Sequence, residues 1–109
     1  MTEEQLQIAT IAYLRSLGFM AFAVPNGEHR TERTGARLKR QGVLAGVSDI
    51  LVLNHPGLAL ELKTATGVVS KHQESFGAAV IAIGWAFRVC RSLSEVEQAV
   101  FDVYGEVDT

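Results

Sequence analysis

Two carboxylates and a lysine lie in adjacent apolar segments of this chain, at spacings that suit a metal site. Asp49 begins the segment Asp49-Ile-Leu-Val-Leu53, while Glu61 and Lys63 belong to the next one, Leu58-Ala-Leu-Glu-Leu-Lys-Thr64. Both segments have the length and composition of β-strands, in which residues two positions apart point to the same face. Burying charges on such a strand is costly unless they are paired or bind a metal ion. Since hard oxygen ligands suit Mg²⁺ and Mn²⁺, the pattern favours the chemistry of a divalent cation.

The pairing register of the two segments decides whether the carboxylates meet. The intervening Asn54-His55-Pro56-Gly57 has the composition of a hairpin turn. In one register Asp49 lies opposite Glu61, with opposed Cβ atoms ~5 Å apart; a shift by one residue puts Asp49 opposite Leu62, on the other face. Two carboxylates at so short a separation repel each other, and a bound cation removes that repulsion. The metal-site hypothesis therefore requires the first register. The alternative is a structural Glu61–Lys63 ion pair with Asp49 as an exposed strand start.

The remaining elements predict an α/β domain of about four strands with helices on its faces. In chain order we expect a helix over 2–17, a strand over 19–24, a polar and basic loop over 28–42 with a short helix near 36–41, strands over 49–53 and 58–64, a helix over 70–83, a strand over 85–91 and a last helix from 92 to about 104. Ser70-x-x-Gln73 and Ser92-x-x-Glu95 both have the spacing of a capping box.

Composition sets the broad class. The chain has 109 residues, a formal net charge of −2, 48% hydrophobic residues and one cysteine, Cys90. These values predict a single globular domain over 1–109 and exclude a disulfide framework. They favour a reducing, cytoplasmic setting. No apolar run reaches the ~18 residues of a membrane span, and the polar, acidic start is unlike a signal peptide.

Positive charge is concentrated in one segment. Between Glu28 and Arg40 there are five basic residues and two acidic ones. A local positive patch of this kind can contact phosphates even when the whole chain is slightly acidic. The alternative is an exposed surface loop without a partner.

Gly46-Val47-Ser48-Asp49, followed by an apolar strand and Glu61-Leu62-Lys63, resembles the core of the PD-(D/E)xK nucleases. More closely, the chain resembles the virus-type replication-repair nuclease (VRR-NUC) domain, and the resemblance covers nearly the whole sequence. Its other matching features are the opening helix from Thr2, Pro25-Asn26-Gly27, Arg30, Gly67 and Ser70-x-x-Gln73. The family's proline before the aspartate is replaced by Ser48, which touches no ligand. The resemblance implies an αβββαβ order, a four-stranded mixed sheet and an extra C-terminal helix.

The resemblance also implies metal-dependent hydrolysis of DNA phosphodiester bonds. In such nucleases the residues matching Asp49 and Glu61, with the backbone carbonyl matching Leu62, hold Mg²⁺ or Mn²⁺, and the lysine matching Lys63 positions or activates the attacking water. An acidic residue of the first helix, Glu3 or alternatively Glu4, joins the site. Gln73 would be an accessory polar residue, although a purely capping role fits it equally well. The candidate DNA contacts are Asn26, Arg30, Arg33, Arg37, Lys39, Arg40 and Lys71.

These features predict a nuclease selective for junction or branched DNA in phage or bacterial replication, recombination or repair. Cutting two strands needs two sites, so we expect a homodimer. One candidate interface is the apolar side of the C-terminal helix, although packing on the chain's own sheet fits these residues equally well: Val96, Val100, Phe101, Val103 and Tyr104. Two alternatives remain open at this point. The first is a nuclease-fold module that binds DNA or a protein without cutting, and the second is a small α/β interaction domain whose charged strand face forms structural ion pairs.

Overall fold

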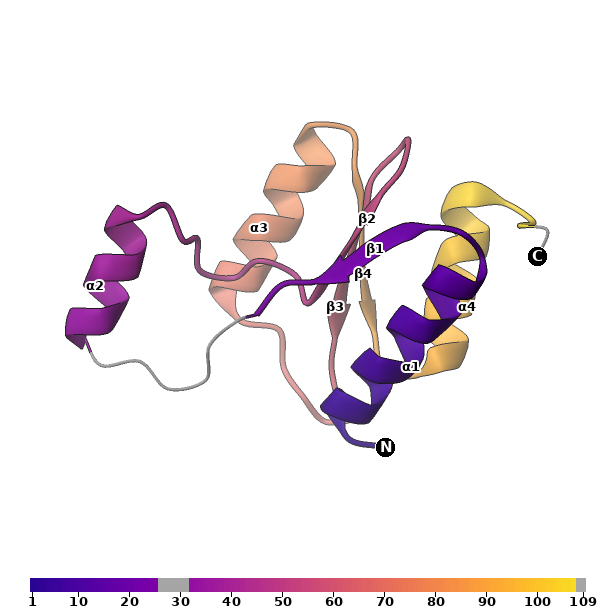
Figure 1. Cartoon of the computed structure of the whole chain (residues 1–109), viewed down its shortest axis with the longest axis horizontal. Helices are drawn as coiled ribbons and strands as arrows, with labels where there is room; N and C mark the ends of the chain where they lie inside the picture. Colours follow the sequence, from indigo (N-terminus) through magenta and orange to yellow (C-terminus); the bar gives the residue numbers. More distant parts are fainter. Residues whose placement is uncertain (26–31, 108–109) are drawn as a thin grey trace.

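The computed structural model describes residues 1–25 and 32–107. Its elements are α1 (Glu3–Ser16), β1 (Met20–Ala23), α2 (Glu32–Arg40), β2 (Ile50–Leu53), β3 (Leu58–Leu62), α3 (Lys71–Ala82), β4 (Ala86–Cys90) and α4 (Leu93–Tyr104) (Figure 1). The predicted α/β class and element order are confirmed, with strand ends one or two residues shorter than expected. Asn26 and Arg30, two of the candidate DNA contacts, lie outside the described residues.

The four strands form one mixed sheet in the order β1-β2-β3-β4. The β1–β2 and β2–β3 pairs are antiparallel, and β3–β4 is parallel. Ile50 pairs with Leu60 and Val52 with Leu58, which is the register that places Asp49 opposite Glu61. A slip of one residue would have turned the apolar set of β2 away from the core, so the hydrophobic pattern itself fixes the meeting of the two carboxylates.

The two faces of the sheet are covered differently. On one face the leucines of β3 join Ile50 and Val52 in a core with α1 and α4. Its buried members are Leu6, Leu14, Ala21, Ile50, Val52, Leu58, Leu60, Leu62, Cys90, Val96, Ala99 and Val100. On the other face α3 packs so closely on β4 that a Cβ atom at Gly77 would lie 2.7 Å from the ring of Phe87. All five residues of β3 are therefore buried, including the charged Glu61.

The helix starts follow the predicted capping pattern with one exception. Thr2 and Ser70 each form a complete capping box. At α4 the Ser92 side chain accepts the N–H of Glu95, but the Glu95 carboxylate accepts from the backbone N–H of Arg91 and not from that of Ser92. The predicted box at Ser92 is thus only half correct, because the end of β4 brings the preceding N–H within reach of the carboxylate.

The C-terminal helix is not an apolar surface that needs a partner. Val96 and Val100 are buried, while Val103 and Tyr104 pack against the same core. Of the apolar side chains that favoured this helix as an interface, only Phe101 is largely exposed. The face belongs to the chain's own core, so α4 is a poor choice of dimer interface.

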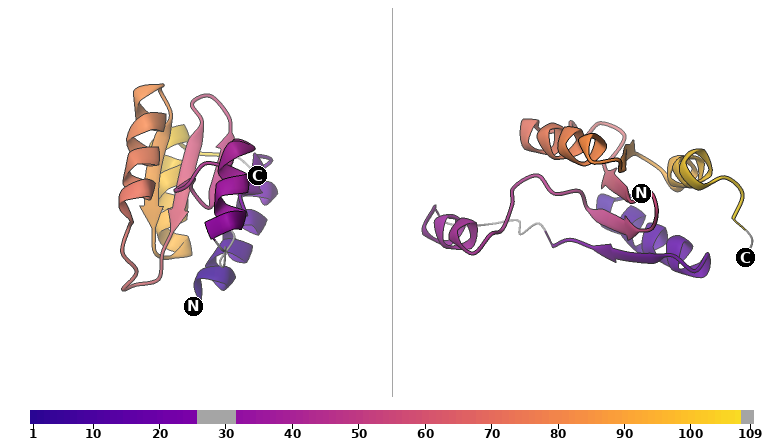
Figure 2. Two further views of the ribbon diagram at one scale, coloured as in Figure 1. Left: turned by 90° about the vertical axis from the view of Figure 1, so that its left-hand side faces the viewer. Right: turned by 90° about the horizontal axis from the view of Figure 1, so that it is seen from above.

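Helix α2 stands apart from the sheet and the other helices (Figures 1 and 2). It begins earlier than predicted and buries none of its own residues. Gly42, with φ +94°, follows its end, and the chain then runs through 43–47 back to β2. Among the described helices, none has both the length and the apolar character of a membrane span.

Candidate active site

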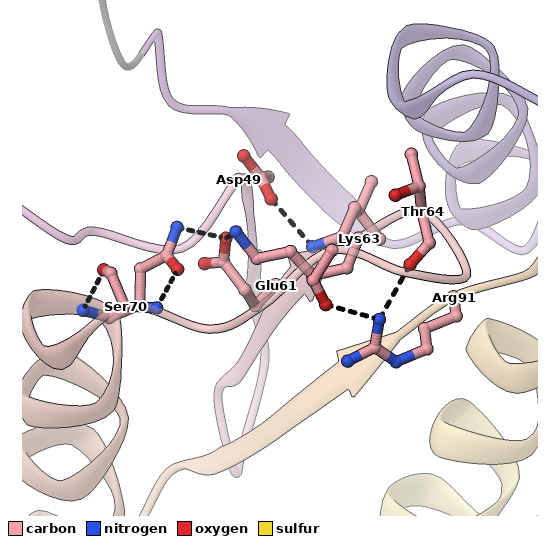
Figure 3. Close-up of polar contacts among 9 residues, drawn as sticks. Asp49, Glu61, Lys63, Thr64, Ser70 and Arg91 are labelled. Carbon is pink, nitrogen blue, oxygen red and sulfur yellow. Dashed lines mark hydrogen bonds and ion pairs between the residues drawn. The ribbon is translucent and has the colours of Figure 1, made fainter.

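The end of the β2–β3 hairpin brings Asp49 next to the backbone that carries Glu61. The carbonyl of Asp49 accepts the N–H of Val24 at 2.9 Å, which extends the β1–β2 pairing by one residue. Its carboxylate oxygen Oδ2 accepts the N–H of Leu62 at 2.7 Å (Figure 3). Strand pairing and this hydrogen bond together fix the Asp49 side chain on the Glu61 face of the ribbon.

Glu61 is a buried carboxyl with only part of its hydrogen-bonding capacity satisfied. Its side chain is 1% exposed, and Oε1 accepts from the Gln73 amide at 2.8 Å and lies 3.8 Å from the Lys63 ammonium nitrogen. Oε2 is also buried but meets no donor among the described residues. An orphaned buried carboxylate oxygen is costly, so this atom is suited to bind a cation or to carry a proton.

The electrostatics of Glu61 support that conclusion. Burial and the neighbouring Asp49 charge, with a smaller contribution from Glu3, raise the pKa of Glu61 to about 8, and the Lys63 charge opposes the shift. The site therefore has more negative charge than the one nearby lysine compensates. A strongly perturbed carboxyl at the end of a strand, beside a cleft, is a recognised mark of a functional site.

Gln73 acts both as a capping residue and as a partner of the buried carboxylate. Its side-chain oxygen accepts the N–H of Ser70 at 2.8 Å and so completes the capping box of α3. Its amide nitrogen donates to Glu61. The cap holds the amide in one orientation, which aims the donor at the carboxylate, so the capping and accessory interpretations are compatible.

A cleft of about 1050 Å³ opens beside these groups. Its lining comes from the start of α1, the end of β1, the loop before β2 and the start of α3; it consists of Glu3, Glu4, Gln7, Val24, Pro25, Leu44, Ala45, Gly46, Val47, Asp49, Ser70, His72 and Gln73. Both candidate glutamates of α1 line it, and Glu3 is the one whose charge acts on Glu61. His72 also lines the cleft, a position that its sequence context did not indicate, because a histidine without metal-ligand spacing carries no signal until α3 is placed.

The other candidates are more scattered. Lys71 is exposed at the first position of α3, and the cations of α2 belong to an element away from the sheet, where none of them is buried. Among the described residues, no group of three histidine, cysteine, aspartate or glutamate side chains is close enough to hold a metal ion alone. The donors that the structure brings together are two carboxylates, one of them with an orphaned oxygen. That set still fits Mg²⁺, which is commonly held by one or two carboxylates while water and substrate phosphate complete its shell.

Gly46 is the residue that allows the cleft wall to approach α3. Its φ is +84°, and a Cβ atom there would lie 2.3 Å from the carbonyl oxygen of His72. We expect Gly46→Ala to lower the free energy of unfolding by clearly more than the ~1–2 kcal/mol of a left-handed alanine, because the start of α3 must also move. Gly84→Ala is the matched control, since Gly84 has φ +94° but nothing within 4 Å of its Cβ position. Equal losses of stability in urea titrations of the two variants would contradict the close-packing argument.

The fold as a whole has a counterpart among solved structures. No family model and no curated protein matches the sequence. A structure search finds a solved chain described as a VRR_NUC domain protein, which superposes with a TM-score of 0.72 over 99% of this chain and 97% of that one, at 19% sequence identity. The sheet and its flanking helices thus have the VRR-NUC fold, as the sequence resemblance predicted.

Proposed function

We propose that the chain is a metal-dependent deoxyribonuclease that hydrolyses phosphodiester bonds, with Mg²⁺ or Mn²⁺ as its cofactor. The observation that carries the proposal is the buried Glu61, which is held beside Asp49 and contacted by Lys63, with one oxygen left without a donor among the described residues. The shared fold with a VRR_NUC domain protein supports a nuclease-type function.

The carboxylates of Asp49 and Glu61, with the carbonyl of Leu62, are the groups that would hold the ion. When bound, a divalent cation polarises a phosphoryl oxygen and lowers the pKa of coordinated water. The hydrogen bond from Leu62 N–H to Asp49 and that from Gln73 to Glu61 keep both carboxylates in place before any ion arrives. Preorganised ligands of this kind avoid the cost of reorientation on binding.

Lys63 supplies the positive charge on the protein side of the reaction. Water attacks the phosphorus and gives up a proton to the solvent, the bond to the leaving sugar oxygen breaks, and that oxygen takes up a proton from the solvent. Negative charge builds on the phosphoryl oxygens during the step. The ammonium group positions the water and stabilises that charge. Glu3, at the start of α1, lines the cleft together with Asp49 and Gln73 and is our candidate for a further acidic member of the site.

We assign the basic arm, defined as α2 with its cations Arg33, Arg37, Lys39 and Arg40, to contact with DNA phosphates. Arg33, Arg37 and Arg40 follow the i, i+4, i+7 spacing of one helix face, the helix buries none of its residues, and the loop after α2 lines the cleft. Asn26, Arg30 and Lys71 complete the proposed DNA-binding set. Branched or junction DNA is the proposed substrate, and a homodimer is the proposed means of cutting two strands.

The basic arm gives a quantitative prediction. Replacing Arg33, Arg37 and Arg40 together by alanine should weaken DNA binding and reduce the slope of log affinity against log salt by about 0.9 for each phosphate that the arm no longer neutralises. The rate at saturating DNA should change little, because these residues lie away from the carboxylates. Fluorescence anisotropy at several salt concentrations measures the affinity and its slope, with Arg88→Ala as a single-charge control. An unchanged salt slope would exclude the arm from the binding surface.

The direct test of the function is a cleavage assay. Purified protein with Mg²⁺ or Mn²⁺ is incubated with single-stranded, duplex, flap and four-way DNA, and Lys63→Ala protein reports contaminating nuclease. We expect cleavage that needs the metal and is absent in the variant. Binding without metal-dependent cutting of any substrate would instead identify a non-cleaving nuclease-fold module.

A further inference from the structure

An arginine outside the nuclease motif contacts the loop that follows it. This loop leaves β3 after Leu62, contains Lys63 and Thr64, and leads to the Ser70 cap of α3. Arg91 directly follows β4 and reaches across to the loop (Figure 3). The loop therefore has an anchor that is distant in sequence from Glu61 and Lys63.

A single nitrogen of Arg91 bridges two loop carbonyls. Its Nη1 donates to the carbonyl of Thr64 at 2.7 Å and to that of Gly67, also at 2.7 Å. A guanidinium Nη1 carries two N–H groups, so each carbonyl takes one, and the donor's charge strengthens both bonds. The Gly67 N–H donates to the Thr64 carbonyl at 3.2 Å, and this hydrogen bond closes the loop into a tight turn beside the arginine.

The anchor itself is firmly placed. The backbone N–H of Arg91 donates to the Glu95 carboxylate at 3.0 Å, and Glu95 N–H donates to Ser92 Oγ at 3.2 Å. The first turn of α4 thus fixes the backbone of Arg91. On the other side, Lys63 N–H donates to the Cys90 carbonyl at 3.1 Å, so the end of β4 holds both the start of the loop and the turn.

The turn lies alongside the side chain of Lys63. A Cβ atom at Gly67 would lie 3.3 Å from Cδ and 3.5 Å from Cβ of Lys63, so there is little spare room between the turn and the aliphatic stem. The Lys63 side chain is only 13% exposed and ends 3.8 Å from Glu61 Oε1. Moving the turn would free the stem to leave the carboxylate.

We propose that Arg91 is a positioning residue that holds the Lys63 ammonium at Glu61 through the Thr64–Gly67 turn. The proposal rests on the assignment of Lys63 to the chemistry. Because a displacement of about 1 Å at a reacting group can cost about 10²-fold in rate, we expect Arg91→Ala to lower kcat about 10- to 100-fold. KM and DNA affinity should stay within about twofold, because a residue that acts through the turn does not itself contact the substrate.

The experiment compares Arg91→Ala, Arg91→Lys and Arg88→Ala. Arg88 is the matched control, because it lies on the strand that precedes Arg91 and its guanidinium donates only to the neighbouring Phe87 carbonyl among the described residues. For each variant, kcat and KM are measured on a DNA that the wild type cuts, and DNA affinity is measured without metal. The rate at which an amine-reactive acylating reagent modifies the Lys63 side chain is followed by mass spectrometry. We expect faster modification and lower kcat in Arg91→Ala, partial recovery in Arg91→Lys and wild-type values in Arg88→Ala.

Three results would overturn the inference. They are an unchanged kcat in Arg91→Ala, a loss of DNA affinity at unchanged kcat (the behaviour of a phosphate contact) and unchanged modification of Lys63. If Arg91→Ala does not fold, Arg91→Lys takes its place, because a lysine keeps the charge but cannot reproduce the two N–H groups of Nη1, and it should give a smaller fall in kcat together with faster modification of Lys63. If the wild type cuts no DNA, the proposed nuclease function fails, and the modification rate of Lys63 alone decides whether Arg91 holds it.

Discussion

Replacing Lys63 by alanine is expected to lower the cleavage rate at saturating DNA and metal by about 10²–10³-fold, the usual cost of removing one preorganised donor to a developing negative charge. Lys63 is the cation in contact with the Glu61 carboxylate, so nothing among the described residues replaces it. It also opposes the rise in the pKa of Glu61. Its loss should therefore move the rising limb of the pH–rate profile to higher pH. Single-turnover rates measured from about pH 6 to about pH 9, the range in which Glu61 titrates, give both the loss of rate and the shift of the rising limb.

The controls separate chemistry from folding. Lys63 is not part of the hydrophobic core cluster, so Lys63→Ala should melt within a few degrees of the wild type and bind DNA without metal as tightly. Lys63→Arg keeps the charge but replaces a compact ammonium by a planar, more diffuse group, and should recover only part of the rate. Cutting by Lys63→Ala within threefold of the wild type (roughly 0.6 kcal/mol in the barrier) would remove Lys63 from the mechanism.

The sequence predicted those parts of the site that depend on local patterns. Alternating apolar residues in the two central strands determine their register, since the wrong register would expose the core face. The Ser70-x-x-Gln73 spacing predicted the start of α3 and thereby placed Gln73 at the end of the sheet. Short-range rules were sufficient there because strand alternation and helix capping each have one dominant physical cause.

The parts that the sequence did not predict depend on contacts between distant segments. Arg91 meets Thr64 across 27 positions, and a lone arginine after a strand has no pattern that announces a carbonyl partner. The apolar face of α4 was equally compatible with a dimer interface, and only the packing of Val96 and Val100 in the core decides the question. At α2 the basic composition was visible, but Gly35 inside the helix obscured where it begins, because glycine weakens a helix interior.

Glu61→Gln is expected to make the metal-free protein more stable at pH 8 while abolishing metal-dependent cleavage. The pKa of Glu61 is raised from 4.5 to about 8 in the folded protein, so between these values the folded state holds a proton that the unfolded chain has released. Stability of the metal-free wild type therefore falls as pH rises through this window and levels off above it. A glutamine stays neutral throughout. Its oxygen can still accept from Gln73, and it carries no charge to repel Asp49, so the gain at pH 8 should be on the order of a few kcal/mol.

The same substitution should remove the effect of metal on stability. An ion that binds only the folded protein stabilises it in proportion to the logarithm of its concentration over Kd, and it competes with the proton on Glu61, so Mg²⁺ or Mn²⁺ should raise the melting temperature of the wild type most at high pH. Glu61→Gln should show neither that rise nor the fall in stability between pH 5 and 8. Glu97→Gln, which removes an exposed carboxylate of α4, should keep both the metal-induced rise in melting temperature and the fall in stability with pH.

Thermal melts with and without metal at about pH 5, 6.5 and 8, which span the titration of Glu61, measure the melting temperatures on which these expectations rest. A Glu61→Gln protein that melts below the wild type at pH 8 without metal would show that the buried charge of Glu61 does not destabilise the fold. A variant that Mg²⁺ still stabilises as much as the wild type would show that Glu61 is not a ligand of the ion.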